Sequence, residues 1–428
     1  MTILDTTIVN VALPTIRRHF GATVSDLQWV VDGYALVFAA LLLSAGALGD
    51  KLGSRRLFVA GLALFTLASA PCGVAPALWV LQVARVLQGV GAAIAVPTSL
   101  ALLRHMFTDS TERAKALGRW AGVSGLAAGA GPVVGGFLVG ALTWRSIFFV
   151  NVPIGIVAVL LTLRFVAESP RQRERSLDLP AQLAGIVALA AITIAFIEGG
   201  ASGWTVPLVL GAFLLFVVAT ATFIRIERRS TSPMLPLELF AAPNFSAGNA
   251  VGFLINFGFY GELFLLSLFF QQARGYSPTI TGLALLPQTG VAAVAAWLAG
   301  RVMSRMGPRA PMMTGLALGG VGLLAFALVG TTSPYVAMAP MLVAIGFGLA
   351  YTMPAMTSAV IESAPRERAG MASGVVNSSR QVGGVIGVAV LGALAGGHRI
   401  EPSALVMALL IAGGAFLVGY LVTLRWIR

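Results

Sequence analysis

Long apolar segments separated by short polar stretches run through the whole chain. An α-helix needs about 20 such residues to cross the ~30 Å hydrocarbon core of a bilayer. The pattern predicts fourteen membrane-spanning helices and hence an all-α polytopic membrane protein. They are expected near residues 1–16, 27–49, 57–74, 78–103, 117–142, 147–166, 183–197, 206–223, 245–270, 281–303, 311–329, 335–360, 370–396 and 404–424.

The first of these segments is shorter than the others. Residues 1–16 extend only about 24 Å as a helix, less than the hydrocarbon core, and they begin without a polar flank. We expect that the natural reading frame starts further upstream or that the sequence is truncated. No cleavable signal peptide is visible, because no basic region precedes the apolar run.

Composition supports the membrane interpretation, and the charge pattern gives an orientation. The chain is 57% hydrophobic and only 10% charged, whereas soluble domains carry about 25% charged residues. The net charge of +12 would suggest nucleic acid in a soluble protein. Here three quarters of the 28 basic residues fall in alternate loops, on the side of residues 50–56. The positive-inside rule places that side, and both termini, in the cytoplasm. We therefore expect a plasma-membrane protein without a nucleic-acid partner.

Metal and disulfide chemistry are not expected. Cys72 is the single cysteine, so no intramolecular disulfide can form, and we interpret it as a small packing residue. His19, His105 and His398 fall in different loops on both sides of the membrane. They cannot assemble a metal site.

The polar stretch between the second and third predicted spans combines glycines with opposite charges. Gly46 and Gly53 allow close packing around Asp50, Arg55 and Arg56. A charged contact between packed helices can form and break as the helices slide, so we expect a conformational latch. An ordinary positive-inside loop is the alternative. The pattern G-x-L-x-D-x-x-G-x-R-R resembles the cytoplasmic loop signature of the major facilitator superfamily.

The chain also contains an internal repeat. The motif at residues 89–91, followed by Pro97, recurs at 346–348, followed by Pro354, an offset of 257 residues. This predicts two homologous six-span halves, residues 1–167 and 241–428. Two additional spans lie in the linker 168–240. This layout resembles the fourteen-span drug:proton antiporter branch of the superfamily. The resemblance implies two six-helix bundles that alternate in access to a central cavity.

Charged residues inside the first predicted spans point to proton coupling, since each such charge is costly in a membrane. Asp5 lies in the stretch L-D-T-T-I-V-N-V-A-L-P, which resembles the first-span signature of that branch. A carboxyl at this depth can take up and release a proton. Asp32 near the outer mouth is a second candidate, and Arg85 is expected to pair with Asp5 or Asp32. The alternatives are a packing carboxyl, an interfacial carboxylate and a structural arginine.

The second half carries a candidate substrate site. Glu262 lies within the first span of that half, where it binds substrate or a proton or pairs with Arg380. Asn256 and Tyr260 flank it at helical spacing and are assigned to the same cavity, with core hydrogen bonding as the alternative. Arg380 lies in the middle of its span. It either binds an anionic substrate or forms a structural ion pair.

The fifth predicted span carries a glycine-proline motif. Gly131, Pro132, Gly135 and Gly136 resemble the G-P-x-x-G-G motif of the superfamily's antiporters. Closely packed glycines with a proline predict a bendable seam that seals or hinges the transport route.

Together these features predict proton-coupled efflux of lipophilic or cationic drugs or antibiotics. The proton gradient would supply the energy, without a cofactor, and the chain is expected to act as a monomer. A proton-coupled metabolite or nutrient transporter would share the fold, but the motif at Gly131 argues against an importer. A membrane-embedded enzyme would need a nucleophile, an acid–base pair or a metal site, and the scattered histidines and the single cysteine of this chain do not supply one. A non-transporting sensor would not need titratable groups in the middle of its spans.

Overall fold

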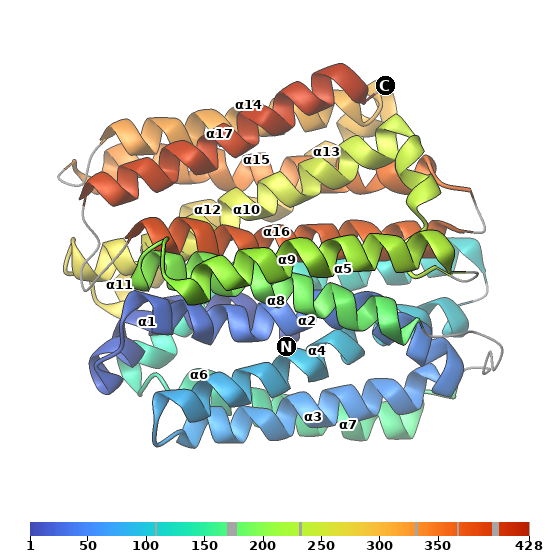
Figure 1. Cartoon of the computed structure of the whole chain (residues 1–428), viewed down its shortest axis with the longest axis horizontal. Coiled ribbons are helices and arrows are strands. Elements are labelled where there is room, and N and C mark those ends of the chain that lie inside the picture. The colour runs from blue at the N-terminus through green and yellow to red at the C-terminus, as the bar shows by residue number, and fades with distance from the viewer. Residues whose placement is uncertain are drawn as a thin grey trace.

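A computed structural model describes residues 1–107, 109–168, 178–230, 233–329, 333–365, 368–395 and 402–427. Their regular structure is helical (Figure 1). The first group of helices is α1 (Thr2–Phe20), α2 (Val24–Leu52), α3 (Ser54–Val74), α4 (Leu78–Met106), α5 (Ser110–Ala141), α6 (Ser146–Phe149) and α7 (Asn151–Phe165). A hairpin follows, α8 (Leu179–Ser202) and α9 (Pro207–Arg229), and then the 3-10 helix η1 (Leu237–Ala241). The last group is α10 (Pro243–Gln272), α11 (Pro278–Ala284), α12 (Leu286–Gly290), α13 (Ala292–Met306), α14 (Arg309–Val329), α15 (Tyr335–Glu362), α16 (Ala369–Ala395) and α17 (Pro402–Trp426).

Each predicted span coincides with helix. Segment 147–166 is divided into α6 and α7, and segment 281–303 into α11, α12 and α13. Within the described residues, eleven helices are long and apolar enough to cross a membrane, or twelve if a pair bent by 41° at residue 285 counts as one span. α1 and α16 do not meet that criterion. The all-helical, polytopic class is therefore confirmed, and the criterion supports eleven to twelve spans.

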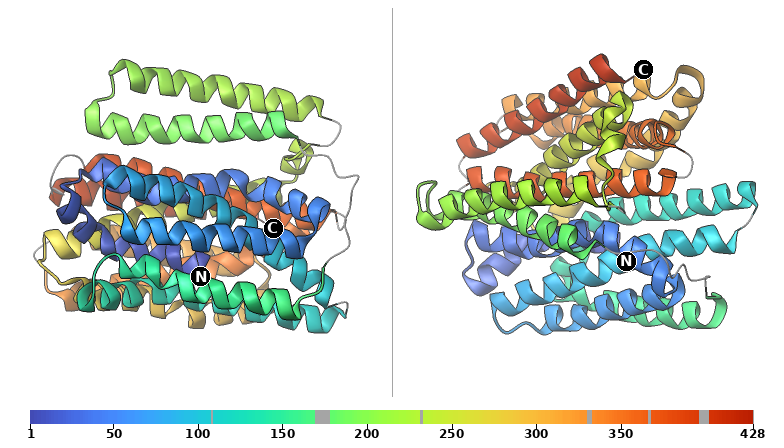
Figure 2. Two further views of the ribbon diagram at one scale, coloured as in Figure 1. Left: turned by 90° about the horizontal axis from the view of Figure 1, so that it is seen from below. Right: turned by 45° about the vertical axis from the view of Figure 1, so that its right-hand side comes forward.

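The helices form two groups with the α8–α9 hairpin beside them. α1–α7 lie in the lower part of Figure 1 and α10–α17 mainly in the upper part. The hairpin stands on one side of the bundle (Figure 2, left). α8 touches both groups: Gln182 donates a hydrogen bond to the Ala40 carbonyl of α2 (2.7 Å), and Gly200 packs against Ala393 of α16. The hairpin thus bridges the line where the two groups meet.

The internal repeat is visible in the packing of equivalent glycines. A Cβ atom on Gly91 of α4 would lie 2.7 Å from the Gly61 carbonyl oxygen of α3. At the repeated position, a Cβ on Gly348 of α15 would lie 2.5 Å from the Gly315 carbonyl oxygen of α14. Only glycine permits helices to approach this closely. The two groups therefore use the same device at matching positions, as the sequence repeat predicts.

At the end that carries the α1–α2 turn, side chains join the two groups directly. Gln28 of α2 donates hydrogen bonds of 2.9 Å to two carbonyls of α16, those of Val388 and Ala389. Its amide lies against Gly392, where a Cβ would be only 2.4 Å from Nε2. Nearby, Arg17 donates to Gln272 (3.0 Å). The seam is closed at this end.

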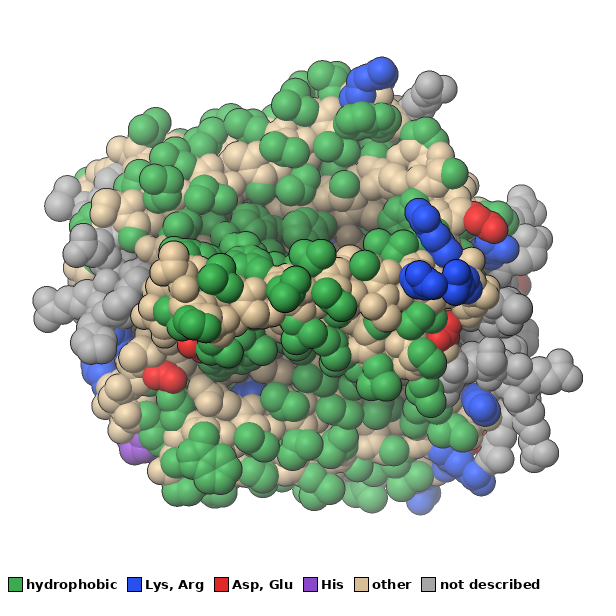
Figure 3. Space-filling model, viewed as in Figure 1, with side chains coloured by type: hydrophobic (Ala, Val, Ile, Leu, Met, Phe, Trp, Pro, Cys, Tyr) green, Lys and Arg blue, Asp and Glu red, His purple; other side chains and the backbone are tan. Residues whose placement is uncertain are grey.

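The surface separates apolar and basic regions. Apolar side chains cover most of the face drawn in Figure 3, and basic ones gather mainly at its right-hand end. That is the end where α2 and α3 meet (Figure 1). Large exposed apolar residues include Leu214 (66%) and Leu328 (84%). Such exposure would be unfavourable in water and suits a lipid-facing surface.

Candidate functional site

The interior of the first helix group contains a buried ion pair. Asp5 of α1 and Arg85 of α4 are fully buried, and the Arg85 guanidinium pairs directly with one carboxylate oxygen. The other oxygen accepts a hydrogen bond from Asn151 of α7 (2.9 Å). A buried carboxylate is tolerated only with such compensation. The predicted pairing of Arg85 is therefore formed with Asp5.

Arg85 connects this pair to the other helices of the group. Its Nε donates to the Val30 carbonyl of α2 (3.0 Å), and its Nη1 donates to Gln88 (2.9 Å). Its guanidinium carbon lies 4.3 Å from the ring centroid of Tyr34, a favourable cation–π arrangement. Any change in the charge of Asp5 consequently reaches α1, α2 and α4 through one side chain.

The network continues into α3. Gln88 donates to the Ser69 hydroxyl (2.7 Å), and the Cys72 thiol donates to Gln88 (3.3 Å). Cys72 is buried and free, so it is a hydrogen-bonding member of the network as well as a packing residue. The sequence prediction did not include Asn151, Gln88 or Ser69. Their only sequence signal was a polar residue within an apolar segment, and Gln88 also lies one turn from Arg85.

Asp32 stands apart from this network. It is fully buried, and neither of its carboxylate oxygens has a hydrogen-bond partner. It lies one helical turn after Gln28, on the face of α2 that meets α16. The alternative pairing of Asp32 with Arg85 is therefore wrong in this conformation. Asp32 sits instead at the seam between the two helix groups.

Glu262 is buried in the second helix group. Both of its carboxylate oxygens accept hydrogen bonds from the Gln288 amide, at 3.2 and 2.9 Å. Gln288 belongs to α12, the short helix at the break of the bent pair. The repeat offset of 257 residues makes Glu262 the counterpart of Asp5 and places Leu342 where the first half has Arg85. The second half thus keeps the interior acid and replaces its cationic partner by a neutral amide.

The alternative in which Glu262 pairs with Arg380 is wrong, and the substrate or proton role of Glu262 stays a prediction. Arg380 packs its side chain against Gly252, where a Cβ would lie 3.1 Å from Arg380 Cγ. Gly252 lies ten residues before Glu262, which is about 15 Å along a helix. The two charges are therefore too far apart to pair.

The grouping of Glu262 with Asn256 and Tyr260 is also wrong. Residues two positions apart on a helix point about 200° apart, so Tyr260 and Glu262 face nearly opposite sides. Asn256 donates to the Gly252 carbonyl (2.9 Å), one turn back, and the Tyr260 ring packs against Gly384 of α16. These two residues share their face with Arg380, while Glu262 faces α12.

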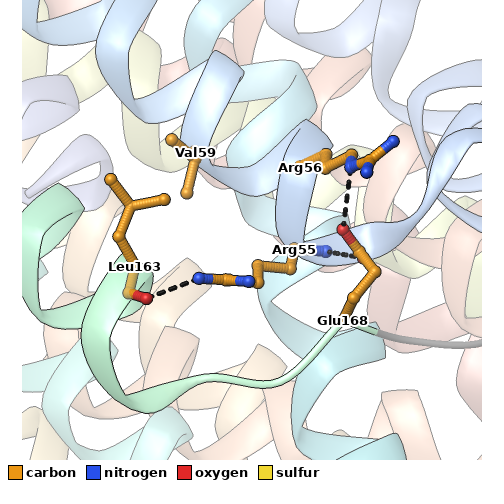
Figure 4. Close-up of a pocket in the computed structure, with 5 residues that line it drawn as sticks. All are labelled: Arg55, Arg56, Val59, Leu163 and Glu168. Carbon is orange, nitrogen blue, oxygen red and sulfur yellow. Dashed lines mark hydrogen bonds and ion pairs between the residues drawn. The ribbon is translucent and has the colours of Figure 1, made fainter.

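At the α2–α3 turn, the basic residues contact an acid that the sequence prediction missed. Glu168 accepts a hydrogen bond from the Arg55 backbone N–H (3.0 Å) and lies 3.6 Å from Arg56 Nε. The Arg55 side chain donates to the Leu163 carbonyl, and these residues line a small pocket (Figure 4). Gly53 has a positive φ of 103°.

The predicted latch also includes Asp50 and Gly46. The Asp50 side chain lies outside the described part of the chain. Gly46 is within 3.8 Å of Pro97 if a Cβ is added, which is ordinary contact distance. Glycine is therefore required at Gly53 by its positive φ, while the nearby Glu168 carboxylate, 2.8 Å from an added Cβ, is the end of a side chain that can move; neither condition applies at Gly46.

The glycine motif of α5 lies between the two helix groups. A Cβ on Gly131 would lie 1.9 Å from Thr7 Oγ1, and one on Gly135 would lie 2.8 Å from the Ile8 carbonyl of α1. On the other side, a Cβ on Gly136 would lie 2.5 Å from the Pro278 carbonyl of α11. α5 remains one helix through Pro132. The motif therefore builds a tight seam, while the observed break falls between α11 and α12.

The described residues contain no group of three His, Cys, Asp or Glu side chains that could hold a metal ion. The candidate polar residues instead form two separate sets. Asp5, Arg85 and Asn151 belong to one helix group, and Asn256, Tyr260 and Arg380 to the other. This division is the arrangement expected when two halves move relative to each other.

Known proteins with similar sequences cover nearly the whole chain. It is 38% identical over 427 residues to the methylenomycin A resistance protein of Streptomyces coelicolor, covering 100% of this chain and 90% of that protein. It is 41% identical over 397 residues to the multidrug resistance protein Stp of Mycobacterium tuberculosis, covering 92% and 73%. It is 37% identical over 399 residues to the tetracenomycin C resistance and export protein of Streptomyces glaucescens, again covering 92% and 73%.

A solved transporter structure and a protein-family match also cover most of this chain. A POT family transporter in complex with 5-aminolevulinic acid superposes with a TM-score of 0.70 at 13% identity, covering 99% of this chain and 92% of that one. At such low identity the likeness concerns the fold alone. Residues 1–388 match the Major Facilitator Superfamily. The chain therefore belongs to the major facilitator superfamily, a family of membrane transporters, and is not an enzyme.

Proposed function

We propose that this chain exports a lipophilic antibiotic or drug across the cytoplasmic membrane in exchange for protons. The relatives are named for resistance to methylenomycin A, for multidrug resistance and for tetracenomycin C export. The helical segments and the separate α8–α9 hairpin are in keeping with the fourteen-span antiporter branch. The basic α2–α3 end is assigned to the cytoplasm by the positive-inside rule, and both termini are assigned to the same side.

The observation that carries this proposal is the buried Asp5–Arg85 pair. Protonation of Asp5 removes its negative charge and weakens its hold on Arg85. The guanidinium, which stays protonated in proteins, then keeps the Val30 carbonyl, Gln88 and the Tyr34 ring as partners. Because these partners lie on different helices from Asp5, a proton on one carboxylate changes how α1 packs in the first group.

In an alternating-access cycle, the change in α1 packing is coupled to the seam between the two helix groups. The closed α1–α2 end is assigned to the outside, so that the seam between α2 and α16 must part when the transporter opens outward. Asp32 lies in this seam beside Gln28, and parting would expose its unpartnered carboxylate to external protons. We therefore assign Asp32 to proton entry and Asp5 to coupling. The contacts of Arg55 and Arg56 with Glu168 would hold the cytoplasmic end in one of the two states.

The second helix group would supply the substrate contacts. Asn256, Tyr260 and Arg380 share one face, as described above, and are assigned to the drug. Glu262 lies on another face with Gln288. It is assigned to proton binding or to coupling the bent helix pair to α10, because it is the repeat counterpart of Asp5.

A susceptibility panel in an efflux-deficient bacterium tests this function. Expression of the wild-type chain is expected to raise the inhibitory concentration of at least one lipophilic antibiotic. Asp5→Asn and Arg85→Gln are expected to lose that protection at equal membrane abundance. Arg301→Gln, which removes a charge at an exposed position of α13, serves as the control and should retain it. Full protection by the Asp5→Asn variant would remove Asp5 from the mechanism.

A further inference from the structure

Arg380 carries a mid-span charge for which the described residues provide no counter-charge. No carboxylate of the described residues lies within 4.0 Å of its guanidinium. Among the described residues its guanidinium makes one hydrogen bond, a long one from Nη1 to the Asn377 amide oxygen (3.4 Å), and its Nε has no partner. The side chain is only partly buried. An arginine inside a membrane helix is costly unless it meets an anion or acceptor, and the described residues offer Arg380 a single neutral acceptor, Asn377.

The depth of Arg380 argues against a lipid headgroup as a further partner. It lies eleven residues from the start of α16, which corresponds to about 16 Å along the helix. Arginines that reach the headgroup region lie near helix ends. A solute that enters between the helix groups is therefore the better candidate.

The neighbourhood of Arg380 is suited to an oxygen-rich anionic group. The Tyr260 ring packs against Gly384, one helical turn after Arg380 on α16. The side-chain amide oxygen of Asn256, one turn from Tyr260, has no hydrogen-bond partner, and as an acceptor it is suited to a hydroxyl or N–H group of the compound and not to its anion. A guanidinium binds a carboxylate with two parallel hydrogen bonds and a phenolate through its single oxygen, and the Tyr260 phenol adds a further donor.

None of the described interior acids lies within ion-pair distance of Arg380, the unpartnered Asp32 included. Asp5, Asp32 and Glu262 are all fully buried. Asp5 is already paired with Arg85, and Glu262 is held by Gln288. Among the described mid-span charges, Arg380 is thus the one that is both partly accessible and unpaired.

We propose that Arg380, with Tyr260, binds an anionic group of the exported compound, so that the preferred substrates are lipophilic acids rather than lipophilic cations. This inference rests on the proposed export function and names the substrate class for its binding site. It also revises the expectation of cationic drugs that the sequence alone suggested. The guanidinium supplies the charge, and the Tyr260 hydroxyl orients the acid by donating a hydrogen bond.

Two xanthene dyes of similar shape and opposite charge test this proposal. Equilibrium binding of anionic fluorescein and cationic rhodamine 6G to the purified full-length protein is measured by fluorescence anisotropy, without a proton gradient. We expect wild type to bind fluorescein more tightly than rhodamine 6G. Arg380→Gln should weaken fluorescein at least about tenfold, because charge-assisted hydrogen bonds are lost. Arg380→Lys should weaken fluorescein less, and the matched control Arg301→Gln should leave it unchanged.

Each other outcome overturns the proposal. If wild type prefers rhodamine 6G, or does not bind fluorescein at all, the site does not bind anions. This comparison uses the wild-type protein alone, so it does not depend on whether a variant folds. An equal loss of both dyes in Arg380→Gln would show a structural arginine. The result is independent of proton coupling, since Asp5→Asn should still bind fluorescein. Efflux that proved indifferent to the proton gradient would defeat the proposed function and leave the dye preference standing.

Discussion

At the scale of single residues, the partner of each interior acid determines how much stability is lost when that acid is replaced by its amide. Asp5 faces the permanent charge of Arg85, whereas Glu262 faces the neutral amide of Gln288. The identities and depths of both acids could be predicted from the sequence. Arg85 was predicted as a partner of Asp5, with Asp32 as the alternative, and the structure forms the pair with Asp5. Asn151 and Gln288 could not be predicted as partners, because they come from other helices and resemble ordinary polar residues in apolar segments.

Asp5→Asn is expected to destabilise the protein much more than Glu262→Gln. Asparagine leaves Arg85 buried without a counter-charge, and breaking a buried pair costs about 3–5 kcal/mol. Glutamine at 262 can still accept from Gln288, so the change should stay near 1 kcal/mol. Cys72 is free and buried, so a thiol-reactive dye added during heating reports unfolding directly.

The double variant Asp5→Asn, Arg85→Gln provides the control for this comparison. Removing both charges should recover part of the stability lost in Asp5→Asn but should not restore export. Equal melting temperatures for Asp5→Asn and Glu262→Gln would contradict the assignment of an uncompensated charge to Arg85.

At the scale of elements, close contacts at glycines determine where helices can move. The apolar pattern predicted the helix positions well, because hydrophobic length alone selects them. It could not predict the break between α11 and α12, since Pro287 resembles the prolines that α4 and α5 accommodate within continuous helices. The contact of Glu168 with α3 was likewise missed, because it depends on the fold and not on sequence proximity.

Gly53→Ala is expected to be more disruptive than Arg56→Ala. Gly53 has a φ of 103°, and an added Cβ would lie 2.8 Å from a Glu168 oxygen. This strain should lower the free energy of unfolding by about 1–3 kcal/mol. Arg56 is 70% exposed, and exposed pairs contribute about 0–1 kcal/mol. Thermal unfolding of the two variants makes the comparison, and a reversed order would argue against a strained turn.

Gly136→Ala is expected to loosen the α5–α11 seam at the α1–α2 end. Its new methyl group would meet the Pro278 carbonyl, which is backbone and cannot rotate away. A cysteine placed at Thr279, with Cys72 replaced by serine, should then react several times faster with an impermeant maleimide in intact cells. Gly122→Ala on the same helix is the matched control, since nothing lies within 4 Å of its Cβ position. Unchanged labelling in Gly136→Ala would mean that the seam does not depend on this contact.

At the scale of the whole molecule, the two helix groups meet at a seam that is closed at one end. Gln28 and the notch at Gly392 fasten α2 to α16 there, and the α8–α9 hairpin bridges both groups. The sequence predicted the two halves through their repeat. It could not predict which end is closed, because both conformations of an alternating-access protein share one sequence.

Gly392→Val is expected to shift the population toward a conformation open at the α1–α2 end. The valine side chain would displace the Gln28 amide and thereby remove two hydrogen bonds between the groups. Spin labels at Arg18→Cys and Ala273→Cys, with Cys72 replaced by serine, should show longer distances by double electron–electron resonance. Gly211→Val, at a position with no neighbour within 4 Å, should leave the distribution unchanged. An unaltered distribution in Gly392→Val would show that Gln28 does not hold the seam.

The most direct test of proton coupling through Asp5 uses purified protein in proteoliposomes with an imposed pH gradient. The transported compound is the antibiotic identified by the susceptibility panel. Wild type should accumulate it against its gradient, and nigericin, which collapses the pH difference, should abolish accumulation. The Asp5→Asn variant should show no accumulation. The Glu262→Gln variant, which is expected to stay folded, is measured beside it for comparison. Accumulation by wild type that persists after nigericin, or accumulation by Asp5→Asn at the wild-type rate, would contradict the central claim.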